Sequence, residues 1–224
     1  MTIANTTVGP PPPFDPELAA ALEAMPELPP SLTIDIVGLM REANAERDAT
    51  DDDLARGGAF EVAHHTADGP HGDVPLLVVR PAGATTTAAV YYIHGGGMVM
   101  GDYEMEDARF DRLCPKYPCV GLSVEYRLAP DTPYPGALDD CYAGLRWAYD
   151  NAAALSIDRD RIGVGGLSAG GGLAAALALL ARDRGEIPVA FQLLECPMVD
   201  DRQVTPSSQL DGLAIWPREA NTFG

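Results

Sequence analysis

Apolar residues beyond residue 74 gather into short, nearly unbroken runs, and segments with helical spacing separate these runs. The runs predict buried strands at 75–81, 88–96, 118–127, 161–168 and 189–198. The segments between them predict helices at 105–117, 134–155 and 169–184. Strands of this kind, alternating with helices, are typical of a mostly parallel sheet covered by helices on both faces. The pattern therefore predicts an α/β fold.

Two further helices are predicted before the first of these runs. In residues 15–25, Asp15 is placed to cap a helix that has Pro16 at its first position. A second helix, within residues 29–49, has apolar side chains on one face: Leu32, Ile36, Leu39 and Met40. These helices predict an N-terminal helical segment, residues 1–57, ahead of an α/β part, residues 58–224. The polar stretch at the C-terminal end predicts no strand.

Acidic residues outnumber basic ones by 33 to 15, which gives a net charge of −18. Such a charge repels nucleic acid and anionic lipid, so neither is expected as a partner. No apolar run reaches the roughly 18 residues that a membrane span requires. The N-terminus lacks the basic start and apolar core of a signal peptide. These patterns predict a cytoplasmic protein.

The four cysteines are Cys114, Cys119, Cys141 and Cys196. None forms a C-x-x-C pair, and no histidine is spaced to complete a zinc site, so no metal is expected. Small buried hydrophobic residues are the favoured interpretation. A disulfide between Cys114 and Cys119 stays open as the alternative.

Ser168 stands at the centre of a Gly-x-Ser-x-Gly pattern, residues 166–170. The pattern joins a predicted strand to a predicted helix, and the glycines on either side allow a sharp turn there. Such a turn holds the serine oxygen out at the end of a sheet, beside a helix N-terminus that favours developing negative charge. Chance occurrence in a glycine-rich loop is the alternative, but the strand–turn–helix context favours a nucleophile.

A second pattern, His94-Gly95-Gly96-Gly97, follows the strand predicted at 88–96. Consecutive glycines let successive backbone N–H groups point into one space, which suits an anionic oxygen in acyl transfer. A flexible turn is the structural alternative. A phosphate loop is disfavoured because no Gly-Lys-Ser/Thr ending follows. His94 is expected to brace the loop rather than to act as a base.

Three segments together resemble the hormone-sensitive-lipase family of α/β-hydrolase carboxylesterases: HGGGMVMGD, SVEYRLAPDTPYPGALDDCYAGLRW and RIGVGGLSAGGGLAAALALLARDRG. The resemblance extends from about residue 75 to about residue 200, and more weakly through the N-terminal helices. It implies an α/β-hydrolase fold with an N-terminal helical cap, a small-molecule ester as substrate and no cofactor.

The resemblance also implies roles for particular residues. Ser168 would attack the ester carbonyl as the nucleophile, and three backbone N–H groups would bind the resulting oxyanion, those of Gly96, Gly97 and Ala169. The segment that begins at Glu125 would steady the glycine loop, together with His94 and Gly95. Two positions depart from the family, since Leu167 replaces a common Asp and Gly172 a common Asn. Small effects on loop stability or substrate choice are expected from them.

The family order is serine, then an acid, then a histidine, but all four histidines precede Ser168. His64 and His65 are expected on or near the first strand, at the sheet edge, and His71 in a turn. The chain is therefore expected to be a partial α/β-hydrolase that lacks the last strands, with their acid and base. Hydrolysis by this chain alone is then expected to be weak or absent.

Two other functions and two kinds of partner stay open. A ligand-binding member of the fold needs no histidine, and an amide or N-acetyl hydrolase would use the same residues as an esterase. An esterase acting on short-to-medium acyl esters is favoured because both the nucleophile and oxyanion motifs are intact. The last predicted strand would leave an apolar sheet edge, which predicts association with a second copy or a complementing chain.

Overall fold

The computed structural model describes residues 12–25, 32–45, 50–85, 87–106, 110, 114, 116–210 and 216–224. The chain divides into two compact units. One comprises residues 1–40 and 200–224, and the other residues 41–199. Residues 41–57 thus belong to the larger unit. The boundary expected at residue 57 separates a helical cap from the catalytic part, and this division by function stays a prediction.

The larger unit is built on a six-stranded sheet with the strand order β1-β2-β4-β3-β5-β6. Strands β1 and β2 pair antiparallel, as do β2 and β4, and the remaining pairs are parallel. The strands are β1 (Phe60–Gly69), β2 (Gly72–Pro81), β3 (Thr87–Ile93), β4 (Cys119–Val124), β5 (Ile157–Leu167) and β6 (Gln192–Glu195). A mostly parallel sheet is confirmed, and β1, which carries His64 and His65, lies at its edge as expected.

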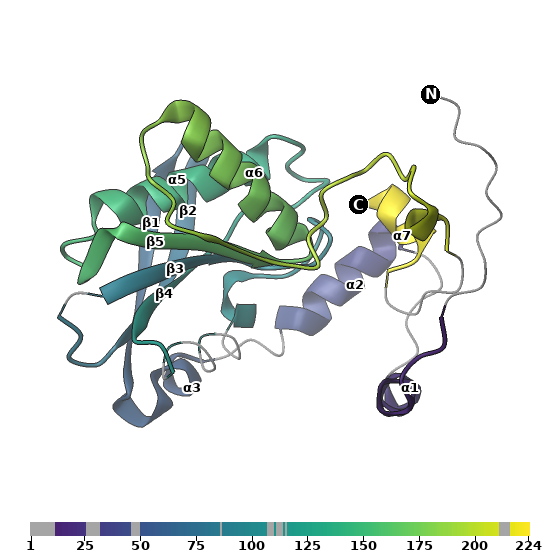
Figure 1. Ribbon diagram of the computed structural model, residues 1–224, viewed down its shortest axis with the longest axis horizontal. Coiled ribbons are helices and arrows are strands. Elements are labelled where there is room, and N and C mark those ends of the chain that lie inside the picture. Colours follow the sequence, from purple (N-terminus) through teal and green to yellow (C-terminus); the bar gives the residue numbers. More distant parts are fainter. Residues whose placement is uncertain are drawn as a thin grey trace. The chain divides into compact units, whose positions relative to one another are not determined.

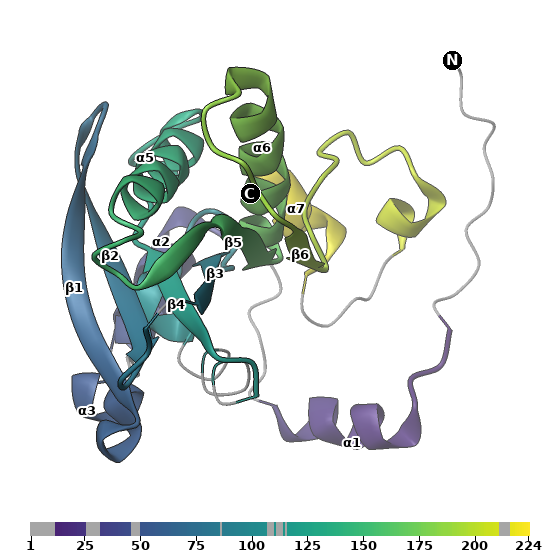
Figure 2. The same cartoon turned by 60° about the vertical axis from the view of Figure 1, so that its left-hand side comes forward.

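Helices α5 (Gly136–Asp150) and α6 (Ala169–Arg184) cover one face of this sheet (Figures 1 and 2). Alternate β2 side chains point to opposite faces, so Leu76 and Val78 join the core beneath these helices. On the other face, Leu77 and Val79 pack with Leu54 of α3 (Asp51–Ala55). Burial on both faces explains why β2 is an unbroken apolar run rather than an alternating one.

Short 3₁₀ helices complete the larger unit: η1 (Arg56–Gly58), after α3, and η2 (Tyr103–Glu106), after the glycine loop. The helix predicted at 105–117 lies largely outside the described residues. Cys114 and Cys119 are free thiols with their sulfur atoms 3.8 Å apart, so the open disulfide alternative is wrong for this structure.

The smaller unit contains α1 (Pro16–Ala24), most of α2 (Ile34–Ala45), η3 (Pro206–Gln209) and α7 (Arg218–Phe223). Asp15 caps α1 as predicted, because its carboxylate accepts a hydrogen bond of 2.9 Å from the Glu17 backbone N–H. Helix α2 continues into the larger unit at Arg41. Within the described part of the chain, no helix combines the length and apolar character required to cross a membrane.

Candidate active site

Ser168 lies between the end of β5 and the first residue of α6. Its backbone has φ 55° and ψ −114°, a combination that residues with a side chain rarely adopt. Such a conformation costs about 1–3 kcal/mol and persists only where the surroundings impose it, most often at functional sites. The Ser168 hydroxyl does not cap α6. The turn therefore holds this side chain without using it to stabilise the helix.

Close backbone contact brings the start of α6 against the glycine loop, residues 94–101. A Cβ atom on Gly170 would lie 2.0 Å from the Ile93 carbonyl oxygen and 2.3 Å from that of His94. A Cβ atom on Gly95 would lie 3.7 Å from the Cβ of Ser168. Any larger residue at position 170 would therefore push the serine turn away from the loop.

The N–H of Gly96 belongs to a peptide whose carbonyl, on Gly95, has two donors. His94 Nδ1 lies 2.8 Å from this carbonyl oxygen, and the Tyr126 hydroxyl shares its one proton between this oxygen, at 3.3 Å, and the His94 carbonyl oxygen, at 3.1 Å. A trans peptide is planar, and its N–H points opposite to its C=O. Fixing the Gly95 carbonyl on the side of His94 and Tyr126 therefore aims the Gly96 N–H to the other side.

The neighbouring peptide is fixed in the same way. The Gly96 carbonyl accepts hydrogen bonds from the backbone N–H of Val99, at 3.1 Å, and of Met100, at 3.0 Å. This turn requires the positive φ of Gly96, 103°, which favours glycine. The N–H of Gly97 therefore points away from the turn.

The third peptide joins Ser168 to Ala169. Its carbonyl, on Ser168, accepts from the backbone N–H groups of Gly172 and Met198, each at 3.0 Å. The Ala169 N–H, at the first position of α6, accordingly points away from the helix body. Each N–H that the sequence predicts as an oxyanion donor thus belongs to a peptide held by two hydrogen bonds on its carbonyl.

His94 is fully buried and stacks on Tyr126, with ring centroids 4.1 Å apart and planes inclined by 12°. Burial lowers the pKa of His94 to about 4, against the smaller raising effect of its bond to the Gly95 carbonyl. The ring is therefore neutral at neutral pH and donates its Nδ1 proton to that carbonyl. A buried imidazole with so low a pKa is a poor proton acceptor.

In the segment that begins at Glu125, both Glu125 and Tyr126 contact the glycine loop or the residues just beyond it. The Glu125 carboxylate accepts from the Tyr103 N–H at 2.8 Å, just beyond the glycine loop. Tyr126 acts on the loop directly, through the carbonyls of His94 and Gly95. Sequence reasoning missed Tyr126, although the requirement that a buried tyrosine hydroxyl find a partner marks it as a candidate.

The same segment is anchored to α5 by a buried charge. Arg127 donates to the fully buried Asp140 carboxylate from its backbone N–H at 3.0 Å, from Nε at 2.7 Å and from Nη2 at 2.6 Å. A bidentate arginine–carboxylate pair of this kind fixes geometry as well as charge. Tyr126 is therefore held immediately beside a rigid anchor.

The other three histidines have partners elsewhere. His64 lies between Asp51, at 2.8 Å, and the Tyr103 hydroxyl, at 3.2 Å. The ring of His65 packs on Trp147, and His71 pairs with Asp139 at 3.3 Å. Within the described residues, no histidine side chain forms a hydrogen bond with Ser168.

Gly172, one of the two departures from the family, has a structural cause. A Cβ atom there would lie 2.1 Å from the Met198 carbonyl oxygen. A larger residue at 172 would therefore displace the strand-end segment whose Met198 N–H binds the Ser168 carbonyl. The small effect expected at this position understates the constraint.

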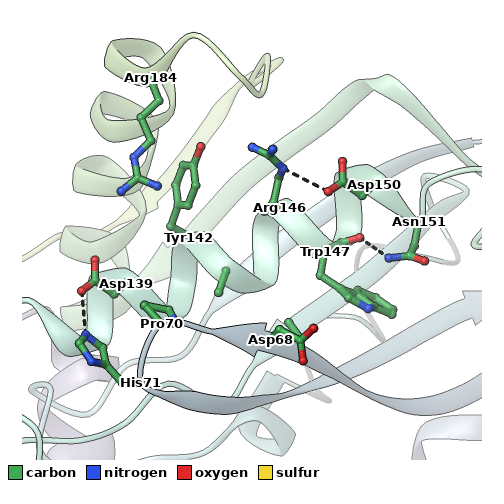
Figure 3. A pocket seen from close by; sticks show the side chains of 12 residues that line it. Asp68, Pro70, His71, Asp139, Tyr142, Arg146, Trp147, Asp150, Asn151 and Arg184 are labelled. Carbon is green, nitrogen blue, oxygen red and sulfur yellow. Dashed lines mark hydrogen bonds and ion pairs between the residues drawn. The ribbon is translucent and has the colours of Figure 1, made fainter.

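Two hollows of the larger unit differ in character. An apolar cavity of about 450 Å³ begins one helical turn after Ser168, at Gly172, and is bounded by Met98 of the glycine loop, Leu138 of α5 and Met198. A hollow of about 570 Å³ lies between α5 and the β1–β2 turn (Figure 3). Four of its charged side chains form the pairs His71–Asp139 and Arg146–Asp150. Neither hollow is lined by Ser168 or by the predicted oxyanion donors, but the apolar cavity is lined by Gly172 and Met198, whose N–H groups bind the Ser168 carbonyl. The apolar cavity is therefore the candidate substrate site.

In the described residues, no group of three or more His, Cys, Asp or Glu side chains is placed to hold a metal ion.

Known proteins resemble this chain in sequence and in fold. A family of proteins with the alpha/beta hydrolase fold matches residues 90–222. Esterase LipI of Mycobacterium tuberculosis is 40% identical over 143 residues, which cover 62% of this chain and 45% of LipI. An arylesterase of Saccharolobus solfataricus is 43% identical over 127 residues, covering 57% of this chain and 41% of the arylesterase. The structure of a bacterial heroin esterase superimposes with a TM-score of 0.82 and 36% identity, covering 93% of this chain and 66% of that one.

The sheet order, the serine turn and the glycine loop together define an α/β hydrolase. The chain belongs to the α/β-hydrolase-fold family, in the hormone-sensitive-lipase group that its motifs resemble. It spans less than half of the length of the curated relatives described above.

Proposed function

We propose that the protein is a carboxylic ester hydrolase that forms an acyl-enzyme on Ser168. The observation that carries this proposal is the position of Ser168, on a strained turn beside three peptides whose carbonyls are each anchored twice. The similar proteins are named as esterases, which supports the same reaction class.

In the proposed reaction, Ser168 Oγ bonds to the acyl carbon and the carbonyl π electrons move onto oxygen. The backbone N–H groups of Gly96, Gly97 and Ala169 stabilise this oxyanion. Because their peptides are fixed beforehand, no reorganisation is needed when the charge develops. The oxyanion then collapses, the alcohol leaves with a proton, and water hydrolyses the acyl-serine.

The proton from Ser168 requires an acceptor. His64, His65 and His71 have other partners, and burial makes His94 a weak base. We infer that the acceptor is a group other than these four side chains. A second copy as partner and a cytoplasmic location also stay predictions.

The apolar cavity suits the hydrophobic part of an ester. Its lining is dominated by alanine, leucine, methionine and proline side chains, and a volume of about 450 Å³ matches a small ligand. Short-to-medium acyl esters are therefore the proposed substrates.

A fluorophosphonate tests the nucleophile, because it bonds covalently to an activated serine. The expected result is a single adduct that peptide mass spectrometry locates on Ser168, with none on the Ser168→Ala variant. Hydrolysis of p-nitrophenyl acetate, butyrate and octanoate should also require Ser168. An adduct on another residue, or equal turnover by Ser168→Ala, would contradict the proposal.

A non-catalytic ligand-binding protein is the second candidate, and it is favoured because the histidines of the described residues bind partners other than Ser168. That function predicts stoichiometric binding of an ester to the apolar cavity, no turnover, and equal affinity in Ser168→Ala.

A further inference from the structure

Arg41, in the second half of α2, joins two loops of the larger unit. Its Nε donates to the Val99 carbonyl at 2.6 Å and its Nη2 to the Ala129 carbonyl at 2.7 Å. Its Nη1 pairs with the Asp131 carboxylate at 2.8 Å. One guanidinium thus contacts both the glycine loop and the segment that follows Arg127.

These bonds belong to a network of hydrogen bonds that includes the Gly96–Gly97 peptide, whose N–H is a predicted oxyanion donor. The Val99 N–H donates to the Gly96 carbonyl, whose peptide carries the Gly97 N–H. The Ala129 N–H donates to the Met98 carbonyl at 2.9 Å, so the two loops are also joined directly. The Val99 carbonyl belongs to the same planar peptide as the Met100 N–H, which also donates to the Gly96 carbonyl, at 3.0 Å. Arg41 holds that carbonyl from outside the turn and so fixes where the Met100 N–H meets Gly96.

We propose that Arg41 is a positioning residue for the oxyanion donors, and that it couples helix α2 to the glycine loop. It acts through Val99 and does not contact the substrate. This role rests on the proposed function, because it presumes that the Gly97 N–H binds the oxyanion.

The arrangement requires an arginine rather than only a positive charge. Two carbonyls and one carboxylate are reached by three nitrogens of a planar fork, whereas lysine has one ammonium group and cannot reproduce this geometry. The carboxylate is the least important acceptor, because the Asp131 side chain is 73% exposed and water screens the pair. Its loss should leave both backbone contacts in place.

The test compares four variants by the rate constant for phosphonylation of Ser168 and by hydrogen exchange in residues 94–101. Arg41→Ala should phosphonylate about tenfold more slowly than the parent protein, less than the 10²–10³-fold loss that follows removal of a donor. Added guanidinium, below denaturing concentration, should restore part of the rate. Arg41→Lys should be slow as well, without rescue. Asp131→Asn and Arg182→Ala, which loses an exposed arginine, should react at the parent rate.

A purely structural role for Arg41 would lower stability without rescue by guanidinium. Arg41→Ala at the parent rate, or a slow Arg41→Ala that guanidinium does not rescue, would overturn the proposal. If Arg41→Ala fails to fold, the rate of Arg41→Lys relative to Asp131→Asn decides in the same way.

Hydrogen exchange in residues 94–101 distinguishes a failure of this inference from a failure of the proposed function. If the parent protein does not phosphonylate, the esterase proposal fails, and exchange alone then tests Arg41. Faster exchange in residues 94–101 of Arg41→Ala than of Arg182→Ala supports the positioning role, and equal exchange refutes it.

Discussion

Gly170 permits the closest contact between the serine turn and the glycine loop, and Gly170→Ala tests that contact. The added Cβ would lie 2.0 Å from the Ile93 carbonyl oxygen and 2.3 Å from that of His94, whereas real Cβ contacts essentially never fall below 3.0 Å. Both neighbours are backbone atoms, so no side chain can rotate away. The start of α6 and the end of β3 must therefore separate by about 1 Å, an overpacking strain that costs about 3 kcal/mol.

The same displacement should slow the reaction of Ser168. A misplacement of about 1 Å can reduce a rate by about 10²-fold. Urea unfolding gives the loss of stability, and the phosphonylation rate gives the loss of reactivity. Gly38→Ala, in helix α2, is the matched control, because a Cβ atom at position 38 would meet no described atom within 4 Å. Replacing a glycine inside a helix by alanine should raise the free energy of unfolding by about 0.5–1 kcal/mol. An unfolding free energy for Gly170→Ala within about 0.5 kcal/mol of the parent, the range of neutral surface substitutions, would refute this reasoning.

Three other predictions follow from buried polar groups. Tyr126→Phe removes the hydroxyl that donates to the His94 and Gly95 carbonyls, and urea unfolding should show a loss of about 1–2 kcal/mol, with slower phosphonylation. Asp140→Asn weakens the hydrogen bonds to Arg127, whose side chain is 34% exposed, and should cost about 1–3 kcal/mol by the same measurement; an unchanged midpoint would contradict the anchoring role. Because burial lowers the pKa of His94 from 6.5 to about 4, the unfolded state binds its proton first, and stability should fall by about 3 kcal/mol as pH drops from 6.5 to 4. His94→Gln should flatten this acid limb, which thermal unfolding across that range can follow.

Most of the sheet could be predicted because burial on both faces leaves a strong sequence signal. Helix α6 has the predicted bounds, since a glycine-rich start and an alanine- and leucine-rich body match one continuous helix. Strand β1 gives no such signal from its own pattern, because its polar residues, including Glu61 and Asp68, are mostly partly or fully exposed. Its ten residues form a strand by pairing in full with β2.

Some residues of the candidate site could likewise be predicted from the sequence, and others could not. Ser168 and the three glycines after His94 could be found because their motifs are local and depend on residue type. The residues that fix the peptides could not be found in this way. Tyr126 and Arg41 act on backbone carbonyls 31 and 58 positions away in sequence, and a backbone acceptor has no residue identity to pair with. Only the fold brings these donors to the loop.

The central claim is that three anchored peptides present N–H groups to an oxyanion beside Ser168. A crystal structure of the protein after reaction with a phosphonate ester tests it most directly, since the phosphonyl oxygen takes the place of the oxyanion. The account predicts phosphorus bonded to Ser168 Oγ, with that oxygen about 2.7–3.1 Å from the backbone nitrogens of Gly96, Gly97 and Ala169. A phosphonyl oxygen turned away from these nitrogens, or bound by other groups, would contradict it.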